Sequence, residues 1–317
     1  MPTQPLVRIG ARGSKLSRAQ SGQIQRRIAA FLGVPPEAAE EACPLVIIST
    51  TGDRVQDRRL QEIGGKGLFT KEIEEALLEG RIDCVVHSMK DMPAVLPPGL
   101  CIAAVPERED PRDAFLSLKA ERLEALAQGA RLGTASLRRQ AQALHLRPDL
   151  DVQMLRGNVD TRIAKLEAGQ VDAILLACSG LRRLGLGHLP KSLIDPVECP
   201  PAPGQGALAI ETRETDRELP WVQALRHAPT MITVAAERGA LTALEASCKT
   251  AVGAHAWLED GVLKLVVEAL SSDGRQRFRH AAASELFQLA QPEASARDLG
   301  LSLGYAVKQA AGDAIGH

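Results

Sequence analysis

The first hundred or so residues alternate between short apolar runs and stretches in which apolar residues recur every three or four positions. Compact apolar runs bounded by glycine, proline or polar residues indicate buried strands, whereas the wider spacing indicates amphipathic helices. The predicted strands lie at residues 6–10, 44–51, 81–86 and 99–105. The predicted helices between them cover residues 16–31, with Ser14 as the expected N-cap, and open again at residues 68–69. Such alternation predicts an α/β domain.

The same alternation restarts after residues 106–113, a charged segment bounded by prolines. Ser136 and Asn158 stand where N-caps belong, each between a predicted strand and the helix that follows it. These patterns predict a second α/β domain, with strands at residues 131–134, 151–155 and 171–177.

A proline-dense segment at residues 199–207 indicates a rigid crossing that leaves the second domain. We expect the apolar residues 207–210 that follow to rejoin the first domain as a strand. Beyond them the pattern is a helix, three strands and a helix, at residues 230–244, 251–258, 262–270, 276–281 and 294–311. The chain is therefore expected to hold two α/β domains, residues 1–106 with 206–224 and residues 107–205, and a small α+β domain, residues 225–317.

Composition narrows the classes of function. Charged residues make up 24% and hydrophobic residues 45% of the 317 residues, as in ordinary globular proteins. A net charge of −1 argues against a nucleic-acid or membrane-surface binder, and 3% aromatic residues argue against base stacking. We find no apolar run of membrane-spanning length and no signal-peptide core in residues 1–10, and we infer a cytoplasmic protein.

The cysteines and histidines indicate no metal centre. None of the six cysteines stands in CxxC spacing, and the seven histidines are dispersed. We expect most of the cysteines to be free thiols in the core. Cys248 differs, because it lies on the predicted loop that opens the third domain.

Lys90 and Asp91 stand side by side where a predicted strand ends, in His87-Ser88-Met89-Lys90-Asp91. In open α/β sheets, ligands and catalysis gather at the carboxyl ends of strands. A local ion pair in a turn would explain Lys90 and Asp91 if they stood alone. Because other strand-to-helix junctions also carry cations, a shared anionic ligand is the better interpretation.

Those junctions place arginine near the starts of predicted helices, where the helix dipole is already positive. The arginines are Arg12, Arg138, Arg139, Arg162 and Arg183, with Arg156 at a strand end. Solvated side chains are the alternative, but surface helices usually carry arginine on the outer face or near the C-terminus. A ligand with several carboxylates or phosphates would offset the positive charge.

Two classes of function are compatible with such a ligand. One is an enzyme that acts on a polycarboxylate, and the other is a non-catalytic two-lobed polycarboxylate-binding protein. A non-catalytic binder would not need the Asp91 carboxylate facing an anion, nor the Cys248 thiol on a loop. Both residues therefore favour the enzyme. The glycine-rich residues 64–67 indicate a mobile loop, and their spacing is not that of a P-loop.

The chain resembles the hydroxymethylbilane synthase family, also called porphobilinogen deaminases. The resemblance runs through nearly the whole chain in order, and together its motifs are very specific. They are Arg12-Gly13-Ser14, Thr51-Gly52-Asp53, Gly64-Gly65-Lys66-Gly67-Leu68-Phe69, His87-Ser88-Met89-Lys90-Asp91, Arg108-Glu109-Asp110-Pro111-Arg112-Asp113-Ala114, Gly133-Thr134, Ser136-Leu137-Arg138-Arg139, Leu155-Arg156-Gly157-Asn158, Gly204-Gln205-Gly206-Ala207 and Cys248.

The resemblance implies a fold and a reaction. The fold would be two periplasmic-binding-protein-like lobes with the active site in a cleft between them, plus a small C-terminal α+β domain. The reaction would join four porphobilinogen molecules head to tail into hydroxymethylbilane, with release of ammonia. A dipyrromethane cofactor bound through a thioether to Cys248 would prime the chain, and the protein would be a monomer.

The resemblance also implies a role for individual residues. Asp91 would be catalytic. The cofactor would be held by Cys248, Lys90, Thr134, Ser136, Arg138 and Arg139, and the substrate and growing chain by Arg12, Ser14, Arg156, Arg162 and Arg183. Lys66 and Phe69 would belong to a mobile loop over the cleft. The sequence departs from the family at Lys15, at Ala135 and around Cys248, where Ala246-Ser247 replaces two glycines and Lys249 replaces glutamine.

Overall fold

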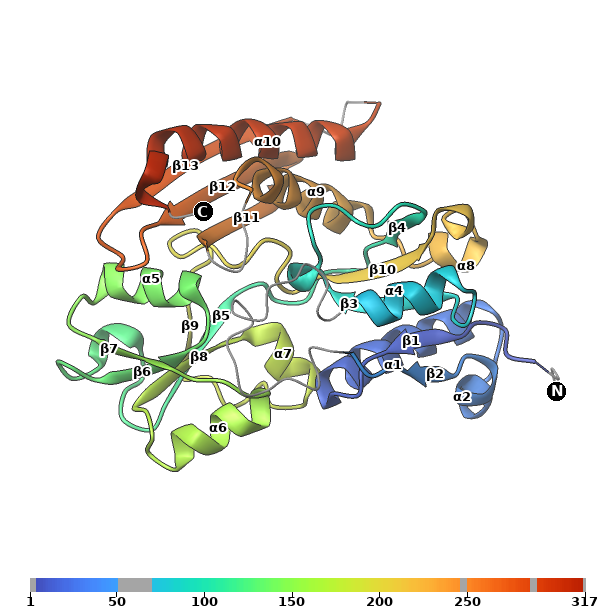
Figure 1. The fold of residues 1–317 in the computed structure, drawn as a ribbon, viewed down its shortest axis with the longest axis horizontal. Coiled ribbons are helices and arrows are strands. Elements are labelled where there is room, and N and C mark those ends of the chain that lie inside the picture. Colours follow the sequence, from blue (N-terminus) through green and yellow to red (C-terminus); the bar gives the residue numbers. More distant parts are fainter. Residues whose placement is uncertain (1–3, 51–69, 246–249, 286–289, 316–317) are drawn as a thin grey trace. The chain divides into compact units, whose positions relative to one another are not determined.

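The structure is a computed structural model that describes residues 4–50, 70–245, 250–285 and 290–315 (Figure 1). The chain forms two compact units. The first comprises Met1–Arg108 and Ala207–Met231, and the second comprises Glu109–Gly206 and Ile232–His317. The second unit contains both the second and the third predicted domain, each with its own sheet. The division into three domains stays a prediction.

The first unit is built on a five-stranded sheet in the order β2-β1-β3-β10-β4. Its strands are β1 (Ile9–Ala11), β2 (Leu45–Ile47), β3 (Cys84–Ser88), β4 (Leu100–Ala104) and β10 (Leu208–Arg213). β1 runs parallel to β2 and β3, whereas β10 runs antiparallel to β3 and β4. The return of residues 207–210 to the first sheet is thus confirmed. β1 begins later than predicted, because the Leu6 amide donates to the Ala42 carbonyl (2.8 Å) and not to a strand.

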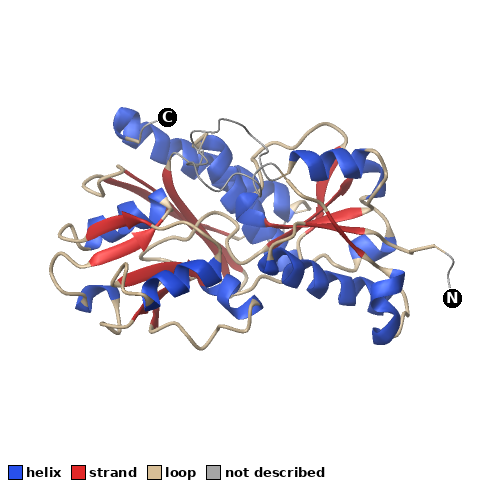
Figure 2. Ribbon diagram, turned by 60° about the horizontal axis from the view of Figure 1, so that its bottom comes forward, coloured by secondary structure: helices blue, strands red, loops and turns tan. Residues whose placement is uncertain are grey.

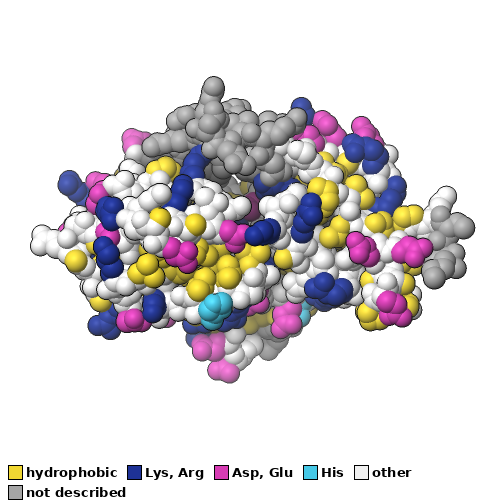
Figure 3. Space-filling view, turned by 90° about the horizontal axis from the view of Figure 1, so that it is seen from below, with side chains coloured by type: hydrophobic (Ala, Val, Ile, Leu, Met, Phe, Trp, Pro, Cys, Tyr) yellow, Lys and Arg dark blue, Asp and Glu magenta, His cyan; other side chains and the backbone are white. Residues whose placement is uncertain are grey.

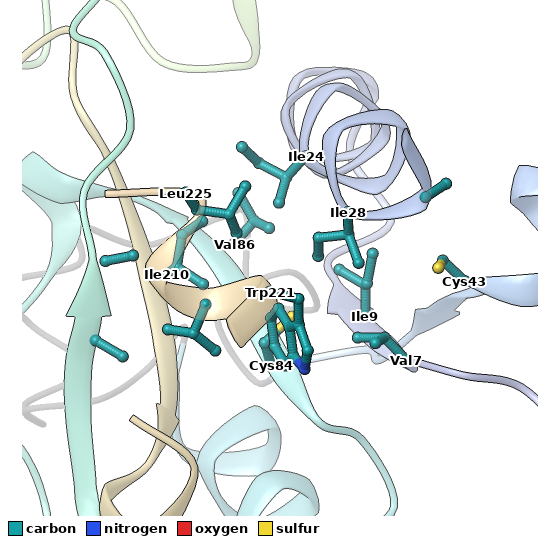
Figure 4. Close-up of a cluster of buried hydrophobic side chains, with 14 of the residues drawn as sticks. Val7, Ile9, Ile24, Ile28, Cys43, Cys84, Val86, Ile210, Trp221 and Leu225 are labelled. Carbon is teal, nitrogen blue, oxygen red and sulfur yellow. The ribbon is translucent and has the colours of Figure 1, made fainter. Parts of the chain in front are cut away.

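Helices cover both faces of this sheet (Figure 2). On one face, α1 packs Ile24 and Ile28 against Ile9 and Val86, with Trp221 completing the cluster (Figure 4). On the other face, α4 packs against the alternate residues of β3. The helices of this unit are α1 (Lys15–Phe31), α2 (Ala39–Ala42), α4 (Lys71–Leu78) and α8 (Pro220–Gln223), with 3-10 turns η1 (Pro36–Ala38), η2 (Met89–Asp91) and η4 (Glu214–Asp216).

The second unit begins with another five-stranded sheet, in the order β7-β6-β8-β5-β9. β6 runs parallel to β7 and β8, and β5 runs antiparallel to β8 and β9. The strands are β5 (Asp113–Ser117), β6 (Arg131–Thr134), β7 (Asp151–Met154), β8 (Ala173–Ala177) and β9 (Ser192–Leu193). The helices are α5 (Leu137–Leu146), α6 (Val159–Glu167) and α7 (Cys178–Arg183), with the turn η3 (Leu123–Ala125).

The rest of the second unit is an antiparallel sheet covered by two helices. The strands are β11 (Ala251–Glu259), β12 (Val262–Leu270) and β13 (Arg277–Ser284), and the helices are α9 (Ala228–Ala243) and α10 (Pro292–Ala311), followed by η5 (Gly312–Ala314). α9 and α10 approach closely: a Cβ at Gly300 would overlap the Ala236 carbonyl, and one at Gly239 would overlap the Arg297 carbonyl. The helix–helix contact therefore depends on glycine.

The surface mixes charges of both signs. On the face shown in Figure 3, lysine and arginine side chains are interspersed with aspartate and glutamate. Among the described helices, none is both long enough and apolar enough to cross a membrane.

We predict that Gly300→Ala destabilises the protein by about 1–3 kcal/mol, because the new methyl group would force α9 and α10 apart. This loss exceeds the roughly 1 kcal/mol that alanine gains over glycine in helix propensity. Urea unfolding would measure it, with Ser302→Ala on the exposed side of the same helix as control. An unchanged or higher midpoint for Gly300→Ala would contradict the prediction.

Candidate active site

The turn after β3 presents Lys90 and Asp91 on the surface of the first unit. Both side chains are exposed, in the 3-10 turn η2. The strand end before them is fixed from two sides: the Gln20 amide donates to Ser88 Oγ (2.9 Å), and the Met89 amide donates to the Ala207 carbonyl (3.0 Å). An accessible carboxylate and a lysine thus stand on a well-anchored strand end.

Arg12 and Ser14 follow β1, the parallel neighbour of β3. Parallel strands bring their carboxyl ends to the same sheet edge, so Arg12 lies at the edge that carries Lys90 and Asp91. Ser14 is the N-cap of α1, as predicted, and its Oγ accepts from the Ser17 amide (3.2 Å). Ser17 Oγ in turn accepts from the Arg12 amide (3.0 Å), which fixes the backbone of the arginine.

In the second unit, Arg138 and Arg139 lie in the first turn of α5, as predicted, but they face a carboxylate of the chain itself. Arg138 Nη1 donates to Asp113 Oδ2 (2.7 Å), and Arg139 Nη2 donates to Asp113 Oδ1 (2.8 Å). The three side chains are only 5%, 7% and 4% exposed, so the alternative of solvated arginines fails for this pair. The two guanidinium groups outweigh the cost of burial and hold the pKa of Asp113 far below its usual range.

One nitrogen of this pair is left without a partner. Arg138 Nε is buried and has no hydrogen bond, although Arg138 Nη1 also contacts Gln142 and the Pro200 carbonyl. The neighbouring hydroxyl groups are engaged locally: Thr134 Oγ1 accepts from the Ser136 amide (3.1 Å), and Ser136 Oγ accepts from the Arg139 amide (3.4 Å) as the N-cap of α5.

Arg156 and Arg162 add positive charge near Arg139. Arg156 follows β7, and Arg162 is the fourth residue of α6, which Asn158 caps as predicted. Arg162 Nε donates to the Gly157 carbonyl (2.8 Å). Burial, together with the positive charges of Arg139 and Arg156, lowers the pKa of Arg162 to about 10. Arg162 thus lies among other positive charges, and such a cluster favours an anion.

The expected placement of Arg183 at a helix start is wrong. Arg182 and Arg183 form the last turn of the short helix α7, where the dipole favours positive charge. Arg183 Nη2 donates to the Gly206 carbonyl (2.7 Å), whereas its buried Nε has no hydrogen-bond partner. Burial lowers the pKa of Arg183 in spite of the nearby Glu109.

These donors suit a ligand with several carboxylates. Buried guanidinium nitrogens without partners on Arg138 and Arg183 can each donate to an incoming oxygen. In the described part of the chain, no group of three histidine, cysteine, aspartate or glutamate side chains could hold a metal ion. Cys248, Lys66, Phe69 and residues 51–53 lie outside the described residues.

Sequence reasoning missed the two buried polar residues that organise the arginine pair. Both residues stand in motifs of the family resemblance, Asp113 in a charged segment and Gln205 in a proline-rich one, but neither was assigned a role. The structure brings them together: Gln205 Nε2 donates to Asp113 Oδ1 (2.8 Å) and to the Pro111 carbonyl (2.7 Å). The two residues are far apart in sequence, so no local pattern indicates the contact.

The fold and these sites define an α/β protein equipped to hold small, carboxylate-rich molecules. A family model described as "Porphobilinogen deaminase, dipyromethane cofactor binding domain" matches residues 7–220, and "Porphobilinogen deaminase, C-terminal domain" matches residues 231–309. The chain belongs to the porphobilinogen deaminase family.

Full-length relatives agree with this assignment. A porphobilinogen deaminase from Phenylobacterium zucineum is 75% identical over 318 residues, and one from Caulobacter vibrioides is 67% identical over 319 residues; each match covers 99% of both chains. A solved structure of the methionine binding protein MetQ is 15% identical, with a TM-score of 0.43, and covers 69% of this chain and 87% of that chain.

Membership of this family defines the activity. The chain is a transferase of tetrapyrrole biosynthesis that joins four porphobilinogen molecules into hydroxymethylbilane, and its cofactor is dipyrromethane. The non-catalytic polycarboxylate-binding protein is therefore the weaker interpretation.

We predict that Asp113→Asn lowers the free energy of unfolding by about 3–5 kcal/mol at pH 7, because two arginines stay buried without their counter-ion. The folded-state pKa of Asp113 is depressed, so its contribution is present at neutral pH and fades as the pH falls below about 4. Chemical denaturation would measure the loss.

The matched control is Asp149→Asn, which removes a carboxylate from a partly exposed pair with Arg147. An Asp113→Asn variant as stable as this control would show that the buried cluster contributes little.

Proposed function

We propose that Asp91 is the catalytic group of this transferase. The observation that carries the proposal is the exposed Asp91 carboxylate beside Lys90, at the sheet edge where Arg12 also lies. A carboxylate there can accept hydrogen bonds from pyrrole N–H groups. It can stabilise the positive charge that develops on porphobilinogen as ammonia leaves, and it can take up the proton lost from the attacking α-carbon.

The cofactor would be attached to Cys248. Its acetate and propionate groups would bind Arg138, Arg139, Thr134, Ser136 and Lys90. The free Nε of Arg138 supports this assignment, because it is a buried donor without a partner. When bound, dipyrromethane supplies the carbon to which the first substrate unit is joined.

The substrate and growing chain would bind the remaining cations. Arg12, Ser14, Arg156, Arg162 and Arg183 are the residues in question. Support comes from the buried Arg183 Nε, which has no hydrogen bond, and from the positive charges of Arg139 and Arg156 that act on Arg162. Lys66 and Phe69 would belong to the loop over the site.

We also propose a cytoplasmic monomer of three domains, residues 1–106 with 206–224, 107–205, and 225–317. The five described cysteines are free thiols, as is usual in a reducing compartment. The most exposed large apolar side chains of the described part, such as Val95, Leu118 and Tyr305, come from separate elements. The sheet β11-β12-β13 forms one hydrophobic cluster with residues of α9 and α10.

We predict that the purified protein, denatured, has an intact mass that exceeds the polypeptide by two linked pyrrole units. Cys248→Ser should lose this excess, because the serine hydroxyl cannot form the thioether. Cys101→Ser is the control, since Cys101 is a free and partly exposed thiol. A dipyrrole that persists in Cys248→Ser would move the attachment to a different residue.

We predict that Asp91→Asn, loaded with cofactor, loses about 10²-fold or more of its turnover, which is typical for removal of a proton-transferring carboxylate. The fold should be unaffected, because Asp91 is exposed. Release of ammonia from porphobilinogen would measure turnover, with the exposed Asp298→Asn as control. Substantial residual activity would remove Asp91 from the catalytic role.

A further inference from the structure

Three titratable side chains meet beneath β3, on the face covered by α4. His87 of β3 and Glu211 of β10 lie on adjacent antiparallel strands, and His87 Nε2 contacts Glu211 Oε2 at 2.9 Å. Glu74 of α4 faces them. All three are buried: Glu211 is fully inaccessible, and His87 and Glu74 are each 8% exposed.

The two carboxylates lack a full set of partners. Glu211 Oε1 and Glu74 Oε1 are both buried and accept no hydrogen bond. Glu211 and His87 both interact electrostatically with Glu74. Burial is the largest of the causes that raise the pKa of Glu74.

Other charged groups around this cluster are engaged elsewhere. Arg213, the next residue of β10 on this face, donates to the carbonyls of Leu77 and Ile82 and pairs with Asp216 and Asp83. Cys101 of β4 stays a thiol because burial raises its pKa. His87 is the side chain that contacts the Glu211 carboxylate on this face.

Burial sets the cost of charge in this cluster. Two ionised glutamates in one buried layer would repel each other, and each has one oxygen that accepts no hydrogen bond. Glu74 avoids that cost when it keeps its proton, in agreement with its raised pKa. The contact with His87 supplies a partner for the other oxygen of Glu211.

The cluster lies directly before the catalytic turn in sequence. His87 is three residues from Lys90 and four from Asp91, and the next residues are tied down by the Gln20–Ser88 and Met89–Ala207 hydrogen bonds. Gln20 fixes one face of the strand end, and Glu211 fixes the opposite face through His87.

We propose that Glu74, His87 and Glu211 form a proton-holding cluster that fixes the end of β3, and that His87 is a positioning residue for Lys90 and Asp91. The positioning role rests on the proposed role of Asp91, whereas the proton-holding role does not. His87 acts through the strand and not by contact with substrate.

The first experiment tests the protonation of Glu74 and does not depend on catalytic turnover. Because the folded-state pKa of Glu74 is raised, its stabilising contribution is complete at acid pH and is lost as the pH rises through that pKa. Glu74→Gln cannot ionise, so its melting temperature relative to the parent protein should rise by about 2 °C or more between pH 5 and pH 8. A difference that is the same at both values, or that falls, would overturn the proton-holding role.

The second experiment tests the positioning role in the cofactor-loaded enzyme. His87→Gln keeps a donor for Glu211 but cannot carry charge. We expect kcat to fall about tenfold or more while KM changes less than about threefold, because the catalytic turn is displaced while the anion-binding arginines stay in place. Intact mass would verify that cofactor loading equals that of the parent.

Asp83→Asn is the matched control, because it weakens the ion pairs of Arg8 and Arg213 at the opposite end of β3. It should lower the melting temperature yet leave kcat unchanged. If His87→Gln keeps full kcat, or if Asp83→Asn loses as much kcat as His87→Gln, His87 has no positioning role. An inactive Asp91→Asn beside a fully active His87→Gln would refute this inference and leave the proposed function standing.

Discussion

The pairing of β10 with β3 is the constraint on which the first unit depends. β10 lies between β3 and β4, so the sheet is complete only after the chain has left to build the second unit and returned. The outgoing and returning segments run together where the Glu109 amide donates to the Gly206 carbonyl (3.2 Å). Gly206 has φ of 92° there, and a Cβ would overlap the Glu109 carbonyl, so a glycine is required. The same pairing brings Glu211 beneath His87.

The first sheet of the second unit has the same arrangement of strands, and β5 takes the position that β10 has in the first unit. β5 pairs antiparallel with β8 and β9, just as β10 pairs with β3 and β4. In the first sheet β2, β1 and β3 run parallel to one another, and in the second sheet β7, β6 and β8 do. The carboxyl ends of these three strands therefore share an edge in each sheet. Arg12, Lys90 and Asp91 stand at that edge in one sheet, and Thr134 and Arg156 in the other. Sheet topology therefore explains why cations far apart in sequence gather in each unit.

The sequence could predict what local patterns encode. The strand before Lys90, the caps Ser14, Ser136 and Asn158, and the return of the chain as β10 are all encoded within a few residues and are confirmed. The predicted helix position of Arg183 was wrong, because α7 begins at Cys178 and ends at Arg183. The sequence did not indicate the contacts of Asp113 and Glu211, because their hydrogen-bond partners come from distant segments of the chain. The roles of Asp91 and Cys248 were read from family resemblance, and they stay predictions.

The two units treat buried charge differently. Beneath β3, two buried glutamates each have one oxygen that accepts no hydrogen bond, and burial raises the pKa of Glu74. Glu74 therefore favours its neutral form without any ligand. In the second unit, one aspartate faces two buried arginines. Asp113 orders the guanidinium groups, and a site ordered in advance loses less conformational entropy when it binds a ligand. The buried Nε of Arg138, which has no hydrogen bond, is the donor that this arrangement leaves for such a ligand.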